Sequence, residues 1–186
     1  MNEHTSSDAR GRRIAFVAHC LLNQNAKVPG LAGYPGVFQP LCTPLTRHGI
    51  GIVQMRCPEM DHLGPGRPLG TDTIDQYDTP AYRDLCRRLA GAVATEAAVY
   101  HAAGYRVLFA LGVEGSPSCS VSNAPVLEAG CRILRPGRGL FMEALAAAFA
   151  AAGLQVPFIG IPEVPESGEL DEALSSLEVV VTCAGE

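Results

Sequence analysis

Three cysteines stand just beyond short apolar runs, where a chain would leave a β-strand. Cys20, Cys57 and Cys119 lie 37 and 62 residues apart in the sequence. Thiolates are soft ligands that select zinc, copper(I) or iron–sulfur centres. Structural zinc sites usually draw on close Cys-x-x-Cys pairs, and these three cysteines form none. Two interpretations remain: a four-iron cluster on three thiolates, which leaves one iron open for substrate, or three small buried side chains.

The chain holds seven cysteines, an odd number without a compact disulfide framework. Such cysteines are more often buried, catalytic or metal-bound than paired in disulfides. Cys86 falls on an apolar helical stripe, so we expect it in the core together with Cys42. Cys131 falls in an expected loop. Cys183 follows an apolar run that is typical of a strand, which makes it the best alternative ligand.

Carboxylate and hydroxyl groups accompany two of these thiols. Glu59 lies two residues after Cys57, where it would take a proton from water or return one to a substrate. Otherwise it is a solvated charge in a loop. Ser116 and Ser118 precede Cys119 and would hydrogen-bond a substrate or a cluster sulfide, unless they only form a turn.

Three segments of the chain resemble the signature segments of the thiouracil desulfidase family. They read His-Cys-Leu-Leu-Asn from His19, Cys-Pro-Glu from Cys57 and Gly-Ser-Pro-Ser-Cys from Gly115. Members of that family typically read Ala-Cys-Leu-Leu-Gly, Cys-Pro-Glu and Ser-Pro-Ser-Cys-Gly, in the same order. The resemblance covers residues 14–120.

The resemblance implies a [4Fe-4S] cluster held by Cys20, Cys57 and Cys119. It also implies that Glu59 and Ser116 are catalytic. The reaction it implies is removal of sulfur from a thiolated nucleobase, with the open iron capturing the sulfur.

The chain departs from the family pattern in two places, so it resembles a divergent branch. Asn-Gln-Asn-Ala-Lys stands at residues 23–27, where the family usually has Cys-Arg-Tyr-Asp-Gly, and Ser120 replaces the glycine after the third cysteine. We expect Asn23, Asn25 and Lys27 to contact a polar heterocycle, with Ser118 as a further substrate-binding residue.

Strand-like and helix-like segments alternate along the chain. This order predicts an α/β fold, a single three-layer Rossmann-like domain with a mainly parallel sheet of about five strands. The expected strands are residues 13–19, 50–55, 105–111, 156–161 and 177–182, and the expected helices are residues 37–48, 79–104, 141–153 and 170–176. If the first strand lies between the second and third, the three cysteines converge at one sheet edge.

The segments between these elements are expected to be irregular. Residues 60–77 and 121–137 are predicted as long loops, with Arg67 and residues 72–78 forming part of a lid. Glu114, beside the end of the third strand, is expected to face solvent. Residues 1–11 are predicted as a disordered leader, and residues 12–186 as the domain.

Composition limits the possible partners. The 186 residues include 47% hydrophobic and 18% charged residues and carry a net charge of −5. This is typical of one globular domain and argues against a nucleic-acid surface. No apolar run approaches the roughly 20 residues of a membrane span, and the polar N-terminus predicts a cytoplasmic protein. We expect a small thiolated substrate and a monomer or homodimer.

Two rival functions remain open. One is a metal-free hydrolase or transferase that uses Cys119 or Cys57 as a nucleophile, although the sequence offers it only His62 as a neighbour of Cys57. The other is a binding or sulfide-carrier module without turnover.

Overall fold

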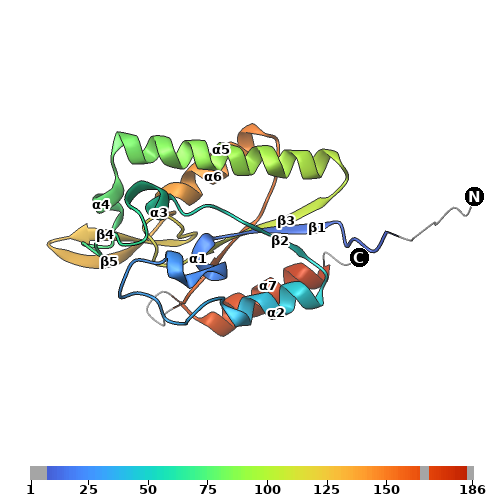
Figure 1. Cartoon of the computed structure of the whole chain (residues 1–186), viewed down its shortest axis with the longest axis horizontal. Helices are drawn as coiled ribbons and strands as arrows, with labels where there is room; N and C mark the ends of the chain where they lie inside the picture. The colour runs from blue at the N-terminus through green and yellow to red at the C-terminus, as the bar shows by residue number, and fades with distance from the viewer. Residues whose placement is uncertain (1–7, 164–167, 184–186) are drawn as a thin grey trace, which may run out of the picture.

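The computed structural model describes residues 8–163 and 168–183, and its centre is a parallel sheet (Figure 1). Four strands pair in the order β2-β1-β3-β6, all parallel. Their bounds are β1 Arg13–Val17, β2 Gly51–Gln54, β3 Arg106–Val113 and β6 Phe158–Ile161. The predicted position of the first strand, between the second and third, is confirmed.

The two central strands are apolar along most of their length because both of their faces are covered. Ala15, Phe16 and Val17 of β1 are fully buried, as are Phe109 and Leu111 of β3. A parallel sheet with helices on both faces needs continuous apolar strands rather than alternating ones. The expected α/β class follows from this pattern.

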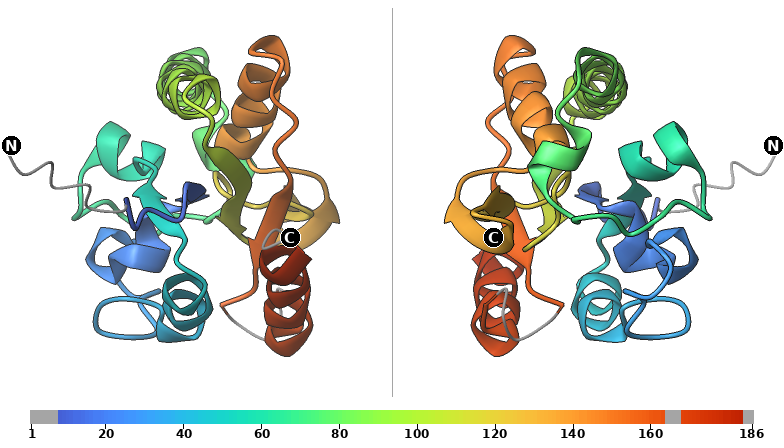
Figure 2. Two further views of the ribbon diagram at one scale, coloured as in Figure 1. Left: turned by 90° about the vertical axis from the view of Figure 1, so that its right-hand side faces the viewer. Right: turned by 90° about the vertical axis from the view of Figure 1, so that its left-hand side faces the viewer.

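Helices cover both faces of the sheet, as Figure 2 shows. On one face lie α5 (Pro80–Ala102) and α6 (Leu140–Ala151), and on the other lie α2 (Gln39–Arg47) and α7 (Leu170–Cys183). The three-layer arrangement is therefore confirmed. None of the helices in the described ranges is long and apolar enough to cross a membrane.

Helix α5 begins and ends where its sequence predicts. The Thr79 side chain accepts a hydrogen bond from the Tyr82 backbone N–H at 3.2 Å, and Pro80 occupies the first turn. Proline suits that turn because its missing N–H has no partner there in any case. Gly104 follows the helix with φ +80°, a left-handed conformation that glycine adopts easily.

Four short helices follow the strand ends or interrupt the segments that were expected to be irregular. Helix α1 and the 3₁₀ helix η1 follow β1. Helix α3 overlaps the start of the predicted loop 60–77, and α4 forms its end. Their bounds are α1 His19–Leu22, η1 Gln24–Ala26, α3 Pro58–Leu63 and α4 Ile74–Tyr77.

The predicted fifth strand at residues 177–182 is wrong. The expected short helix continues through it as α7. Leu177 and Val181, four residues apart, are fully buried, while Val179 between them is 63% exposed. Burial at a spacing of four residues is the helical period, and packing against the sheet outweighs the strand preference of the three consecutive valines.

The predicted loop at residues 121–137 is also wrong, because it holds an antiparallel hairpin. Strand β4 (Asn123–Glu128) pairs with β5 (Cys131–Pro136). The two turn residues, Ala129 and Gly130, have φ values of +49° and +78°, as the tight primed hairpin turns require. The leader prediction falls partly outside the described residues, and residues 8–11 within them are exposed and have no regular secondary structure.

Burial in the central strand yields a stability prediction. Leu111→Ala should lower the free energy of unfolding by about 2–5 kcal/mol, because it opens a cavity between the sheet and its helices. Urea denaturation measures this change. Val99→Ala on α5 is the control, since Val99 is 64% exposed and the change should stay within about 0.5 kcal/mol. Equal losses in both variants would contradict the central position of β3.

Candidate functional site

Three separate segments bring Cys20, Cys57 and Cys119 to one cavity. Cys20 lies in α1, which follows the end of β1. Cys57 precedes α3, and its Sγ accepts a hydrogen bond from the Met60 backbone N–H at 3.5 Å. Cys119 lies in the segment between β3 and β4. Each thiol therefore follows the carboxyl end of a parallel strand, where ligands bind in open α/β sheets.

The cavity has a volume of about 370 Å³, within the range of small-molecule sites. Its apolar lining includes Val28, Leu31 and Leu69. Ionisable side chains also line it, together with the thiols: Lys27, Glu59, Arg67, Asp72, Glu114, Arg132 and Glu163. This combination suits a small molecule with an apolar face and a polar edge.

Burial makes the three thiols poor acids. It raises the pKa of Cys57 to about 11, and nearby Glu59 adds to that rise. Burial also raises the pKa values of Cys20 and Cys119. Charge repulsion from Cys57 adds to both of these rises, and Cys20 adds to the rise at Cys119. A thiol in such surroundings ionises only when a cation compensates its charge, as a bound metal does.

The arrangement of the possible ligand side chains can be compared with what a single metal ion and a multi-iron cluster need. Within residues 8–163 and 168–183, no three His, Cys, Asp or Glu side chains converge closely enough to hold one metal ion. A multi-iron cluster is wider, and each cysteine binds a different iron, so its ligands need not converge on one point. The three thiols at one cavity are soft ligands of the kind that such a cluster uses.

Glu59 is buried beside the thiols, with 8% of its surface exposed. Its Oε1 accepts a hydrogen bond from Ser118 Oγ at 2.8 Å, and its Oε2 accepts one from Arg67 Nη2 at 3.1 Å. Arg67 is itself only 3% exposed and also donates to the Ala26 carbonyl at 3.1 Å. The alternative of a solvated charge does not hold for Glu59, because its two oxygens are fixed by donors from two other segments.

The serines of the third segment have different positions. Ser118 is fully buried and does not line the cavity; its Oγ lies 2.6 Å from the Tyr82 hydroxyl and hydrogen-bonds Glu59. Ser116 lines the cavity, and its Oγ accepts from the Cys119 backbone N–H at 3.0 Å. Ser118 thus positions a carboxylate, whereas Ser116 both forms the turn and faces the cavity.

The prediction that Glu114 faces solvent is wrong. Glu114 is 8% exposed and accepts hydrogen bonds from Ser120 Oγ at 2.8 Å and from the Asn123 backbone N–H at 2.9 Å. Gly160 on β6 leaves room for it, because a Cβ there would lie 1.7 Å from Glu114 Oε1. The buried carboxylate therefore holds together the segment that carries Cys119.

The first loop contributes one of its three predicted contact residues to the cavity. Lys27 lines the cavity and forms an ion pair with Glu163. Asn23 caps η1 by accepting from the Asn25 backbone N–H at 3.2 Å, and neither asparagine lines the cavity. The Glu163 carboxylate also accepts a hydrogen bond from the Tyr34 hydroxyl.

Sequence reasoning missed Arg132 and Glu163 at the site, and it assigned Asp72 only to a lid segment, without a role of its own. Arg132 reaches from β5, donates to the Gly115 carbonyl at 2.6 Å and lies 3.2 Å from Asp72 Oδ2. The sequence did not place Arg132 at the site because its hairpin was predicted as a loop. Glu163 follows the Gly160-Ile161-Pro162 end of the fourth strand, and that position was the one available signal.

The other cysteines lie elsewhere. Cys86 is buried on α5, as expected, and Cys42 is half-buried on α2. Cys131 is exposed on β5 instead of in a loop. Cys183 is the last residue of α7, so it does not follow a strand, and its side chain lies outside the described part of the structure.

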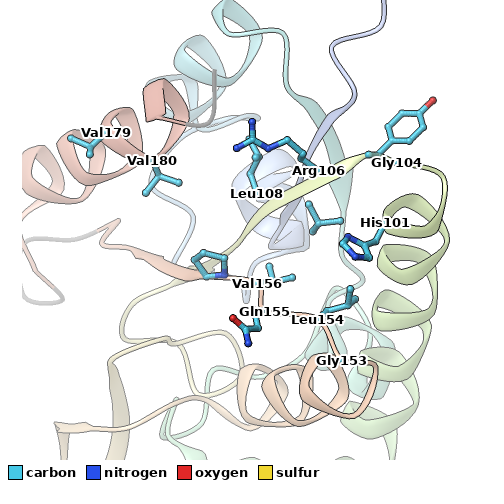
Figure 3. A pocket seen from close by; sticks show the side chains of 13 residues that line it. His101, Gly104, Arg106, Leu108, Gly153, Leu154, Gln155, Val156, Val179 and Val180 are labelled. Carbon is cyan, nitrogen blue, oxygen red and sulfur yellow. The ribbon is translucent and has the colours of Figure 1, made fainter. Parts of the chain in front are cut away.

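A second hollow of about 810 Å³ lies at the opposite end of β3 (Figure 3). Its wall includes Leu108, Leu154 and Val180, with His101 and Arg106 at its polar positions. No cysteine, aspartate or glutamate lines it. The smaller cavity is therefore the candidate site, because it alone of these two is lined by thiols and carboxylates.

The metal-free nucleophile finds little support in this geometry. The raised thiol pKa values oppose formation of the thiolate that such an enzyme needs. His62 is the histidine nearest to Cys57 in the sequence. Its ring packs edge-on against Tyr82, with ring centroids 5.2 Å apart.

One curated relative is similar in sequence over much of the chain. The uncharacterized protein MJ0003 of Methanocaldococcus jannaschii is 36% identical over 112 residues, which cover 60% of this chain and 70% of that protein. No family model and no solved structure matches the chain.

The buried position of Glu114 can be tested by removing its charge. Glu114→Gln should lower the free energy of unfolding by about 1–3 kcal/mol, because an amide nitrogen would face donors that now bond a carboxylate oxygen. Chemical denaturation measures the loss. Glu128→Gln is the control, since Glu128 pairs with Arg135 on the exposed hairpin surface and its removal should leave stability unchanged. A stable Glu114→Gln variant would contradict this role.

Proposed function

We propose that this chain, which belongs to the same family as the uncharacterized archaeal protein MJ0003, is a desulfidase. Its substrate would be a thiolated nucleobase or a similar small thiocarbonyl compound. The observation that carries the proposal is the shared cavity of Cys20, Cys57, Cys119 and Glu59. These residues come from the three segments that resemble the thiouracil desulfidase family, and they lie far apart in the sequence.

Cys20, Cys57 and Cys119 would hold a [4Fe-4S] cluster in this cavity. When bound, such a cluster supplies an iron without a protein ligand, a Lewis acid that attracts a thiocarbonyl sulfur and makes the attached carbon more electrophilic. Burial favours this use of the thiols, because their raised pKa values leave them neutral until a metal charge compensates the thiolate.

Glu59 would be the base that takes a proton from the attacking water. Its carboxylate lines the cavity, and Arg67 and Ser118 fix its two oxygens from the protein side. Such anchoring keeps a catalytic group oriented before substrate arrives, which lowers the entropy lost in the reaction. Ser116, with its oxygen already accepting a backbone N–H, would donate its hydroxyl hydrogen to the substrate.

The cavity walls would select the substrate by shape and polarity. The apolar side chains of Val28, Leu31 and Leu69 suit the face of a flat ring and limit the water around it. On the polar part of the wall, Lys27 and Arg132 would face electronegative atoms of the ring.

Replacement of the three ligands yields the first test. Cys20→Ala, Cys57→Ala and Cys119→Ala should each bind less than half the iron of the wild type after anaerobic reconstitution, measured as iron and acid-labile sulfide per chain. Cys86→Ala is the control, because Cys86 is also a buried cysteine but does not line the cavity. It should keep full iron content.

The outcomes separate the rival functions. A wild-type protein that binds no iron after reconstitution would overturn the cluster and favour the cysteine nucleophile. Bound iron without sulfide release from 2-thiouracil or other thiolated bases would favour a sulfide carrier. Equal iron loss in Cys86→Ala would overturn the ligand assignment.

Glu59→Gln should keep the cluster and lose turnover. We expect sulfide release from 2-thiouracil to fall about 100-fold or more, because an amide cannot accept a proton from water. Asp61→Asn on the same helix is the control: Asp61 pairs with Arg56 and does not line the cavity, so its activity should stay within about twofold. A fully active Glu59→Gln variant would exclude the base role.

A further inference from the structure

Asp72 is a second carboxylate that faces the cavity. It lies in the segment between α3 and α4, and its side chain is 18% exposed. Its φ of +50° is left-handed, which is uncommon for residues other than glycine. Backbone conformations of this kind persist only where surrounding contacts fix them, and they cluster at functional sites.

Several contacts fix Asp72 in this conformation. The Gln76 side chain accepts a hydrogen bond from the Asp72 backbone N–H at 3.0 Å, and Arg132 Nε donates to its carbonyl at 3.1 Å. Arg132 Nη2 lies 3.2 Å from Oδ2 of the same residue. Arg132 thus holds both the backbone and the carboxylate, and it also binds the Gly115 carbonyl at 2.6 Å. The orientation of Asp72 is therefore coupled to the segment that carries Cys119.

The charges around Asp72 suit a group that exchanges protons near neutral pH. Burial raises its pKa to about 6; Glu59 on α3 adds to the rise, whereas Arg132 on β5 and Lys27 from the first loop reduce it. A base with a pKa slightly below the working pH is mostly ionised and still accepts a proton readily. The ion pair with Arg132 favours the ionised form at neutral pH.

Desulfidation requires the transfer of two protons. Water adds to the carbon of C=S: a C–O bond forms, the π bond of C=S opens with its electron pair moving to sulfur, and one O–H bond of the water breaks as its proton leaves to a base. The second O–H bond breaks when the carbonyl forms and the C–S bond cleaves. Sulfur leaves with the electron pair of that bond and takes up both protons from the bases, so the sum is thiocarbonyl plus water to carbonyl plus hydrogen sulfide, with no oxidant or reductant.

We infer that Asp72 is the base for the second proton, which it removes from the hydroxyl of the tetrahedral adduct as the carbonyl forms. This inference rests on the proposed desulfidase function, in which Glu59 takes the first proton. The two carboxylates belong to different segments and line one cavity, so each has its own proton to accept. Carboxylates in different environments commonly divide the proton transfers of one reaction in this way.

Asp72→Asn tests the inference in the reconstituted protein. Its kcat for 2-thiouracil should fall about 100-fold, with KM changed by less than about threefold, because the amide keeps the contact to substrate and loses the proton acceptor. In the wild type, kcat/KM should decrease as the pH falls below about 6, because the base becomes protonated. This decrease should be absent from Asp72→Asn.

Asp75→Asn is the matched control. Asp75 lies next to that segment, in α4, and also holds the hairpin by accepting from the Leu127 backbone N–H at 2.8 Å, but it does not line the cavity. It should keep wild-type kcat and the wild-type pH profile. Equal losses in both variants, or a loss below twofold in Asp72→Asn, would show that the segment acts only structurally and would overturn the inference.

A binding measurement separates this inference from the proposed function. The carboxyl carbon of Asp72, identified in NMR spectra of ¹³C-aspartate-labelled protein by its absence from Asp72→Asn, should titrate near pH 6 and shift when uracil is added. A wild type that releases no sulfide, while this resonance responds to uracil, would overturn the desulfidase function and retain Asp72 as a base facing a ring. A resonance that does not shift when uracil is added would overturn the proposed role of Asp72, whether or not the protein releases sulfide.

Discussion

Parallel pairing of β1 with both of its neighbours is the constraint on which the site depends. Hydrogen bonds continue this pairing past the strand ends: the Met55 N–H donates to the Val17 carbonyl at 2.8 Å, and the Ala18 N–H donates to the Leu111 carbonyl at 2.9 Å. The chain therefore stays in register until two residues before Cys20 and Cys57. Because parallel strands end at the same edge, three segments that are distant in sequence are delivered to one cavity.

Charge balance is the second constraint, since the cavity buries several ionisable groups. Arg67 pairs with Glu59, Lys27 with Glu163 and Arg132 with Asp72. The first pair joins α3 to the segment after it, the second joins the segments after η1 and β6, and the third joins β5 to the segment before α4. An unpaired buried charge is strongly unfavourable, so these pairs fix how the surrounding segments meet. The thiols differ from these pairs, because burial raises the pKa values of Cys20 and Cys119 and so disfavours their ionisation.

Patterns within single segments predicted much of this arrangement, and contacts between segments account for the rest. The apolar runs, Pro80 and Gly104 indicated the central strands and α5 correctly. The residues 177–182 misled because three adjacent valines favour a strand by propensity, whereas burial at Leu177 and Val181 has the helical period. Sequence patterns did not reveal the roles of Glu114, Arg132 and Asp72, because these roles depend on partners tens of residues away or on the β4–β5 hairpin. The turn of that hairpin begins with alanine, which is uncommon there.

The fit between Glu114 and Gly160 has a consequence for the order of events during synthesis. Glu114 holds the segment of Cys119, and its own backbone N–H donates to the Ile161 carbonyl of β6 at 3.0 Å, beside the space that Gly160 leaves. Residue 160 must therefore leave the ribosome before that segment reaches its final conformation, long after Cys20 and Cys57 have emerged. Domains fold as units once their long-range partners are available. Any cofactor that requires all three thiols would thus be inserted after β6 has emerged, and not into a shorter nascent fragment.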